Sequence, residues 1–259
     1  MNKNFVCAIN GSTKVAKWEH VVKLYEEDPE YKGIRLVNKL TDRHINPDKF
    51  QKMKVKYATQ VLSQKVAVTM GFLAERNILP SECTQTADVI LFFDELFDSL
   101  NGSYDNSKKR SGKTLLTQVT PKSEHGTIWS KAKIVLSSMK FVNSNSLTQD
   151  KQVTVPTINN WLRTINNVEY LIEILHKKYN IKSVWMRHFN QDPLENFFGL
   201  IRSHGCRNTN PTVTGFESSF AALLINNLSG QHSPGANCEE DSCQTMFKSM
   251  GSLFKHAEK

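Results

Sequence analysis

Two carboxylates near the start of a predicted helix are the side chains of this sequence best placed to do chemistry. Asp192 and Glu195 lie three residues apart in the stretch HFNQDPLENFFGLIRSHGCR, which spans residues 188–207. Asp192 suits the N-cap of a helix, Pro193 its first position and Glu195 its third. Carboxylate oxygens are the ligands that hard divalent cations prefer, so this pair could hold a metal ion at the end of a helix.

Two interpretations of this pair compete. In the first, Asp192 and Glu195 form an Asp-x-x-Glu capping box and only satisfy the free backbone N–H groups of the helix start. In the second, the two carboxylates bind a divalent metal ion. Capping boxes are far commoner than metal sites, so the spacing by itself favours the first interpretation without excluding the second.

The helix that must position this pair is predicted from the spacing of its apolar residues. These residues repeat at intervals of three and four and would form one buried face: Leu194, Phe197, Phe198 and Ile201. Gly205 is expected to end the helix in a left-handed conformation. Glu195 would then project from the side of the buried face.

The stretch QDPLENFFGLIRSHGCRNTNPT resembles a signature of the P element transposase family, which includes the THAP-domain transposases. In that family the Glu of the motif is the last acid of an RNase H-like Asp-Asp-Glu triad. The Asp three residues earlier helps to bind the metal of a guanine nucleotide. The resemblance therefore implies that Glu195 is a catalytic and metal-binding acid, and that Asp192 binds the nucleotide together with its Mg²⁺.

A second segment, NGSTKVAKWEHVVKLYEEDPEYKGIRLVNKLTDRHINPDKFQKMKV, is also similar to the family. There it follows shortly after the second acid of the triad. Neither of the first two acids has a counterpart in this sequence, so we expect the chain to begin after them and its active site to be incomplete. Metal ions held by three carboxylates activate water or a DNA 3′-hydroxyl in such transposases, and Glu195 alone cannot hold two metal ions.

The resemblance also implies an insertion domain that interrupts the RNase H-like fold and binds GTP. Its nucleotide contacts carry over to six residues: Lys39, Lys54, Val55, Phe97, Asp98 and Asn101. The chemistry suits guanine, because a carboxylate accepts from the N1 and exocyclic amine edge, an aromatic ring stacks on the base, and lysines meet phosphates. Asp98 and Asn101 are three residues apart, so one helix end could present both to a single ligand.

The remaining elements are predicted from apolar periodicity. Helices are expected over residues 17–27, 48–73, 86–100, 128–142, 158–179 and 215–228, and short strands over residues 5–10 and 181–186. The helix over residues 48–73 is expected to point five side chains inward: Met53, Val55, Ala58, Leu62 and Val66. Its lysines would then form a solvated or phosphate-binding face, which the charge pattern does not decide.

The segment Ser111-Gly112-Lys113-Thr114 looks like the end of a nucleotide-binding P-loop. The first glycine of that motif would fall at Ser107, and no strand is predicted before the segment, so we reject this interpretation. We expect instead a mobile loop between helices, with its basic cluster exposed.

Composition limits the classes of protein that this chain can belong to. It has 259 residues, with 33 Lys and Arg against 25 Asp and Glu, which gives a formal net charge of +8 and favours a polyanionic partner. Its five scattered cysteines predict no disulfide framework, and it has no evident signal peptide or membrane span. We expect a soluble protein of a reducing compartment, with no membrane partner, and the family resemblance implies the nucleus.

Together these observations predict a mainly α fold, in which a helical insertion domain is followed by the C-terminal helical segment of an interrupted RNase H-like fold. The predicted boundaries are 1–11 for the end of the N-terminal RNase H-like part and 12–185 for the GTP-binding insertion domain. Residues 186–228 would be the C-terminal RNase H-like part, and residues 229–259 a polar tail.

Three hypotheses for function remain open. The chain is part of a P element-type transposase that performs GTP-dependent cut-and-paste DNA transposition, with GTP and Mg²⁺ as cofactors and transposon-end DNA as partner. Alternatively, it is a non-catalytic module that binds nucleotide, DNA or another protein. In the third hypothesis it is a helical domain whose carboxylates only cap helices and whose lysines are only solvated. Assembly into a homo-oligomer is left open in all three.

Overall fold

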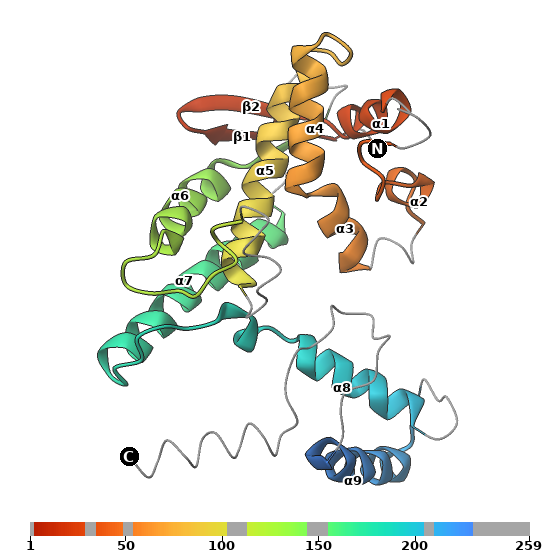
Figure 1. Ribbon diagram of the computed structural model, residues 1–259, viewed down its shortest axis with the longest axis vertical. Coiled ribbons are helices and arrows are strands. Elements are labelled where there is room, and N and C mark those ends of the chain that lie inside the picture. Colours follow the sequence, from red (N-terminus) through yellow and green to blue (C-terminus); the bar gives the residue numbers. More distant parts are fainter. Residues whose placement is uncertain are drawn as a thin grey trace. The chain divides into compact units, whose positions relative to one another are not determined.

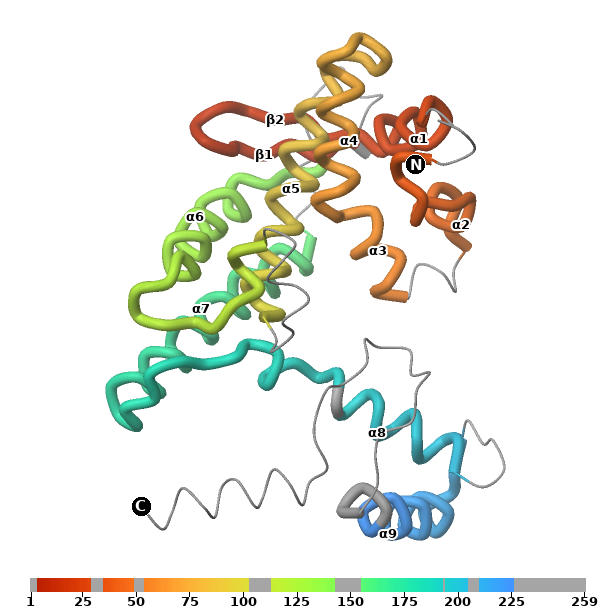
Figure 2. The backbone as a smooth tube through the Cα atoms, viewed as in Figure 1, coloured from red at the N-terminus to blue at the C-terminus, as the bar shows by residue number. Residues whose placement is uncertain are grey.

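Helices dominate this chain, as the sequence predicts, and their path is drawn as a ribbon in Figure 1 and as a tube in Figure 2. The computed structural model describes residues 3–28, 35–48, 54–102, 113–143, 155–204 and 210–229. It divides into two units, Met1–His188 and Phe189–Lys259, which are described separately. The predicted polar tail lies outside the described residues, apart from its first position. In the described ranges, no helix is both long and apolar enough to cross a bilayer.

A three-stranded antiparallel sheet in the first unit has the strand order β2-β1-β3. β1 (Lys3–Ile9) and β2 (Ser12–Ala16) form a hairpin, and β3 (Lys140–Asn143) pairs with β1 on its other side. Asn10 and Gly11 make the hairpin turn with φ angles of 51° and 76°, which an Asn-Gly pair adopts readily. The predicted strand over residues 5–10 is confirmed, whereas β2 and β3 were not predicted.

The helix α5 (Cys83–Leu100) contributes to both hydrophobic cores of the first unit. Its Phe92 and Leu96 belong to one core, and its Cys83 and Ile90 belong to the other. The helix packs against α4 (Gln64–Glu75), α6 (His125–Ser138) and β2, and Figure 1 shows it running beside α4. The predicted helix over residues 86–100 is therefore confirmed and begins one turn earlier.

The first core is built from the sheet, α5, α6 and α7 (Pro156–Lys177). Trp129 of α6 is 2% exposed, and its Nε1 donates a hydrogen bond of 3.0 Å to Ser99 Oγ of α5. The predicted helix over residues 128–142 is wrong at its C-terminal end, because α6 ends at Ser138 and residues 140–143 form β3. The predicted strand over residues 181–186 is reduced to a single bridge between Val184 and Val119, followed by the 3₁₀ helix η3 (Met186–Phe189).

The second core lies among α1 (Trp18–Glu27), α2 (Asp42–Ile45), α3 (Val55–Val61), α4 and α5. The single helix predicted over residues 48–73 is wrong, because α3 ends at Val61 and Ser63 begins a new helix. The Ser63 hydroxyl accepts a hydrogen bond from Val66 N, as an N-cap residue does. The predicted inward face also fails before this break: Val55 is 68% exposed and Ala58 is exposed, whereas Val66 is fully buried. Met53 lies outside the described residues.

The second unit contains α8 (Asp192–Ser203) and α9 (Val213–Ser229), which pack against each other. Aromatic rings form the contact: the centroids of Phe197 and Phe220 are 5.5 Å apart in an edge-on arrangement. Ile201 is buried, but Leu194 is 53% exposed and Phe198 is 41% exposed. The apolar face predicted for this helix is therefore only partly covered by α9.

Candidate functional site

An acidic face forms near the C-terminal end of α5. Asp94, Asp98 and Asn101 follow one another at spacings of four and three residues, which places them on one side of the helix. Asp94 and Asp98 are each only 8% exposed. Buried carboxylates need a counter-charge, because removing an unpaired charge from water costs several kcal/mol.

Lys113 supplies that counter-charge. Its Nζ lies 3.0 Å from both carboxylate oxygens of Asp94 and 2.7 Å from Oδ2 of Asp98. Burial on its own would lower the pKa of Lys113. The hydrogen bonds and charges of Asp98 and Asp94 outweigh that effect and hold the pKa above its ordinary value. The three groups together carry a formal charge of −1 and form a compact ion-paired cluster, which we call the Asp94–Asp98–Lys113 cluster.

The segment that delivers Lys113 is fixed against the end of α5. A Cβ atom on Gly102 would lie 2.6 Å from the carbonyl oxygen of Thr117, so only glycine fits at this close approach. Two residues after Lys113, the carbonyl of Leu115 accepts a hydrogen bond of 3.1 Å from His125 Nε2. His125 is 1% exposed, and burial lowers its pKa.

This arrangement corrects the interpretation of residues 111–114. We expected the basic residues there to be exposed, but Lys113 is half-buried and bridges two carboxylates. The sequence signal that could have found this contact is the presence of Asp94 and Asp98, two acids one turn apart on a largely apolar helix. Such a helix face requires a cation from elsewhere in the chain. Ser111 and Gly112 lie outside the described residues.

The residues predicted to contact nucleotide fall into two groups. Phe97 and Asn101 are partly buried and lie with Asp98 at the end of α5, where Asn101 is the C-cap residue. The other group belongs to segments that surround the second core: Lys39, Lys54 and Val55. All three are exposed, with Lys54 at the N-cap of α3 and Val55 as its first residue.

Asp192 and Glu195 lie in the first turn of α8, in the second unit. The N-cap residue is Gln191, so the prediction of Asp192 at the cap is wrong by one position. Asn190 Nδ2 donates a hydrogen bond of 3.0 Å to Asp192 Oδ2, while Asp192 N donates to Asn190 Oδ1 at 3.2 Å. Glu195 is exposed. Negative charge is favourable at this end of a helix, because the backbone N–H groups there give it a partial positive charge.

The first turn of α8 offers at most two carboxylates to a metal ion. Among the described residues, no group of three or more His, Cys, Asp or Glu side chains is close enough together to hold a metal. A two-metal centre of the kind used for phosphodiester chemistry needs further acids. Asp192 and Glu195 alone therefore do not fit such a centre. The helix also ends at His204 in an extended conformation, and the predicted end at Gly205 lies outside the described residues.

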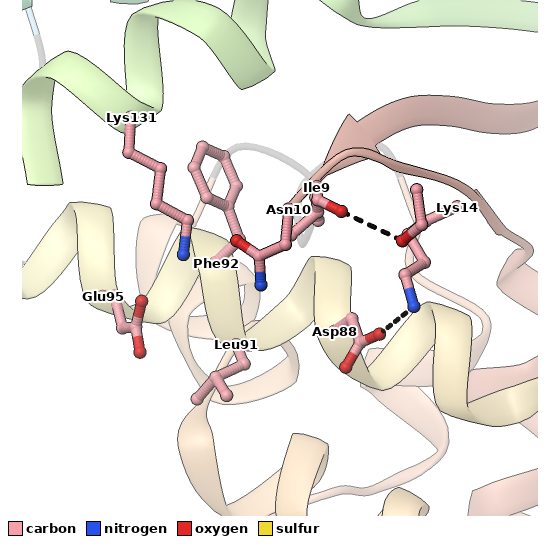
Figure 3. A pocket seen from close by; sticks show the side chains of 9 residues that line it. Ile9, Asn10, Lys14, Asp88, Leu91, Phe92, Glu95 and Lys131 are labelled. Atoms are coloured by element: carbon pink, nitrogen blue, oxygen red, sulfur yellow. Dashed lines mark hydrogen bonds and ion pairs between the residues drawn. The ribbon is translucent and has the colours of Figure 1, made fainter.

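A cavity of about 370 Å³ opens on another side of α5 (Figure 3). The β1–β2 hairpin, α5 and α6 line it with Ile9, Asn10, Ser12, Lys14, Asp88, Leu91, Phe92, Glu95 and Lys131. Lys14 and Asp88 form an ion pair of 2.7 Å across it. Asp94, Asp98 and Lys113 are not among the residues that line it. The cavity is thus separate from the acidic face.

Comparisons with known proteins connect both units to one group of enzymes. A family model described as the TNP-like GTP-binding insertion domain matches residues 3–113, and one described as the TNP-like RNase H C-terminal domain matches residues 188–221. The "Transposable element P transposase" of Drosophila melanogaster is 23% identical over 197 residues, which cover 74% of this chain and 24% of that protein.

A solved structure described as the Drosophila P element transposase strand transfer complex has a similar fold. The TM-score is 0.65, with 21% sequence identity over 85% of this chain and 47% of the solved chain. The present chain therefore spans about a quarter of the length of the curated relative and about half of the solved one.

Proposed function

We propose that this chain, which belongs to the P element transposase family, binds GTP at the C-terminal end of α5 and supplies Glu195 as one acid of a DNA transposase. The remaining metal-binding acids would come from another part of that enzyme. Mg²⁺ would accompany the nucleotide and the transposase reaction, which acts on transposon-end DNA in the nucleus.

The observation that carries the nucleotide proposal is the buried acidic face of α5. It lies within the segment matched by the GTP-binding insertion domain, and it holds Asp98 with Phe97 and Asn101 beside it. A carboxylate offers about four lone-pair directions, so Asp98 can accept from a base while it stays paired with Lys113. The ion pair fixes the direction of the Asp98 side chain before any ligand arrives.

Such a carboxylate distinguishes guanine from adenine. Guanine presents two donors on one edge, N1–H and the exocyclic amine, and a carboxylate can accept from both. Adenine presents an acceptor at N1, so its lone pair would face the negative oxygens. A site built to accept hydrogen bonds rejects a ligand that lacks the donors, because the buried polar group is then left unsatisfied.

Titration calorimetry of the chain with GTP and ATP in the presence of Mg²⁺ tests the proposal. Asp98→Ala should weaken GTP binding about ten- to a hundredfold, the equivalent of about 1.5–3 kcal/mol for a charge-assisted hydrogen bond. Asp88→Ala is the matched control, because Asp88 lies on the same helix and is also paired with a lysine. Equal affinity for GTP and ATP would overturn the assignment.

The conservative variant Asp98→Asn separates recognition from folding. Xanthine carries a carbonyl at C2 where guanine carries its exocyclic amine. The side-chain amide of Asn can donate a hydrogen bond to that carbonyl. Asp98→Asn should therefore bind GTP more weakly and xanthosine triphosphate more tightly. A residue that only stabilised α5 would not change base preference in this way. Thermal melts of each variant without nucleotide show whether the variant protein is still folded.

A non-catalytic module that binds nucleotide and DNA is the second candidate. It is favoured by the first turn of α8, where Asp192 and Glu195 alone do not fit a two-metal centre. Both candidates predict GTP binding, so only activity separates them. The decisive measurement is strand cleavage by a complete transposase assembled with this chain's residues 188–221 in place of its own.

A further inference from the structure

The cavity in Figure 3 is lined along one side by four residues of α5. Asp88, Leu91, Phe92 and Glu95 follow one another at spacings of three, one and three residues, which places them on the same side of the helix. The turn of the β1–β2 hairpin and Lys131 of α6 complete the lining. The volume of about 370 Å³ equals that of about a dozen water molecules, so a ligand of about ten non-hydrogen atoms fits.

The lining combines apolar side chains with four charged ones. The apolar side chains form what we call the apolar floor: Ile9, Leu91 and Phe92. Ile9 and Phe92 are each only 5% exposed, so this floor is continuous with the first core. Two of the charged residues, Lys14 and Asp88, satisfy each other in an ion pair of 2.7 Å.

Lys131 and Glu95 are the other two charged residues of the cavity. Both are half-buried, and in the part of the chain that the structure describes neither side chain forms an ion pair or a hydrogen bond. Figure 3 shows the ends of both side chains directed into the cavity, together with the amide of Asn10. A half-buried charge has lost part of its hydration without gaining a partner, so each favours a ligand group of opposite sign.

These two charges restrict the class of ligand. An anion would be attracted to Lys131 but repelled by Glu95, and the reverse holds for a cation. An uncharged molecule would displace water from both charges and satisfy neither of them. A zwitterion satisfies both charges at once. The Asn10 amide can contact either group of such a ligand, because it has two donors and an acceptor oxygen.

We propose that this cavity binds a free α-amino acid with an apolar side chain. The carboxylate of the ligand meets Lys131, its ammonium group meets Glu95, and its side chain packs on the apolar floor. This inference does not rest on nucleotide binding, because the Asp94–Asp98–Lys113 cluster does not line the cavity.

Leucine and two analogues that each lack one charge test the ligand class. In titration calorimetry of the full chain, leucine should bind with a Kd of about 0.01–1 mM, as expected for a ligand of this size. 3-Methylbutylamine lacks the carboxylate and 4-methylpentanoate lacks the ammonium group. Each analogue should therefore bind about tenfold more weakly than leucine, because one charge of the cavity stays without a partner. Both enantiomers of leucine are titrated, since three points of contact distinguish mirror images.

Variants of the two charged residues test the site. K131M and E95Q each remove one charge with little change in shape and should weaken leucine binding about tenfold. The double variant E95K/K131E exchanges the two charges. It should restore binding but prefer the opposite enantiomer, because the carboxylate and ammonium of the ligand change places while its side chain stays on the apolar floor. K122M is the control, because it neutralises an exposed lysine that does not line the cavity.

Four results would overturn the proposal. Leucine fails to bind at concentrations up to about 10 mM, or an analogue with one charge binds as tightly as leucine. The third is leucine binding that K131M and E95Q leave unchanged, and the fourth is a double variant that keeps the preference of the wild type. Far-UV circular dichroism and thermal melts show whether each variant is folded. The two neutral variants keep the test decisive if the charge exchange prevents folding, since neither removes a side chain of the core.

Discussion

Two carboxylate pairs lie at opposite ends of their helices and in contrasting surroundings. Asp94 and Asp98 are near the C-terminal end of α5, with side chains only 10% and 12% exposed and a lysine between them. Asp192 and Glu195 lie in the first turn of α8, one partly buried and the other exposed. Both pairs are about one turn apart in sequence, so spacing does not distinguish them. The two pairs are distinguished by their burial and by the nearest cation.

The comparison teaches how each pair can meet a ligand. The first pair is neutralised in part within its own unit, so it is held rigid and suits the recognition of a neutral base edge. The second pair is stabilised by its position at a helix start and by the hydrogen bond between Asn190 and Asp192, and the side chain of Glu195 is exposed to solvent. It suits a metal ion that other acids help to hold. The predictions below test this difference, from the largest expected effect to the smallest.

Glu195→Gln should reduce strand cleavage by a complete transposase about a thousandfold or more, because a metal-binding carboxylate stabilises the transition state by several kcal/mol. The present chain alone should show no cleavage with Mg²⁺ or Mn²⁺. A plasmid-nicking assay measures both. Metal-dependent nicking by the chain alone that disappears in Glu195→Gln would show that the site is complete after all.

Lys113→Ala should lower the free energy of unfolding by about 2–4 kcal/mol, because it leaves two buried carboxylates without their cation. Urea denaturation followed by circular dichroism measures the loss. Lys177→Ala is the control: it breaks the exposed Lys177–Glu173 ion pair and should not shift the transition measurably. Equal stability of the two variants would mean that the Asp94–Asp98–Lys113 cluster contributes no more than a surface pair.

Acidification should destabilise the first unit through His125. Burial holds its pKa below the ordinary value of 6.5 in the folded chain. Its contribution to stability is therefore complete above about pH 6.5 and is lost as the pH falls from there towards the folded pKa. His125→Gln should flatten the stability profile between pH 7 and pH 5 in urea titrations. His20, whose pKa burial also lowers, accounts for part of the slope that remains. An unchanged profile would remove His125 from this role.

The smallest effects are expected at α8. Asp192→Ala should cost about 0.5–1 kcal/mol, because it removes a first-turn acid and its contact with Asn190. Glu195→Ala should change stability by no more than about 0.5 kcal/mol, as expected for an exposed acid at a helix start. Thermal melts compare the two variants. If Glu195→Ala loses more stability than this while the complete transposase carrying it still cleaves DNA, Glu195 only stabilises the start of the helix.

Periodicity predicted the long helices because the residues that each helix buries recur every three or four positions in the sequence. α5 and α8 were found with ends correct to within a few residues. The break at Ser63 was missed, since a single capping hydroxyl divides two segments that both have helical spacing. The strand β2 was also missed, although an Asn-Gly pair directly after an apolar run is a strong hairpin signal.

The candidate sites could be predicted only in part. The resemblance to a family, not the spacing, selected Phe97, Asp98 and Asn101. Lys113 could not be placed from local sequence, because 19 residues separate it from Asp94 and the loop between them carries no periodic signal. Whether Glu195 catalyses and whether Lys39 and Lys54 contact nucleotide remain predictions, as do the domain boundaries, because neither the geometry nor the family matches test them.

The shared position of α5 has a consequence for how the first unit unfolds. Side chains of this helix belong to both cores, so α5 cannot unfold without exposing apolar side chains of each core. The two cores should therefore melt in one cooperative transition. A ligand held at the end of α5 should slow amide hydrogen exchange in α4 and α6 together, although those helices lie in different cores.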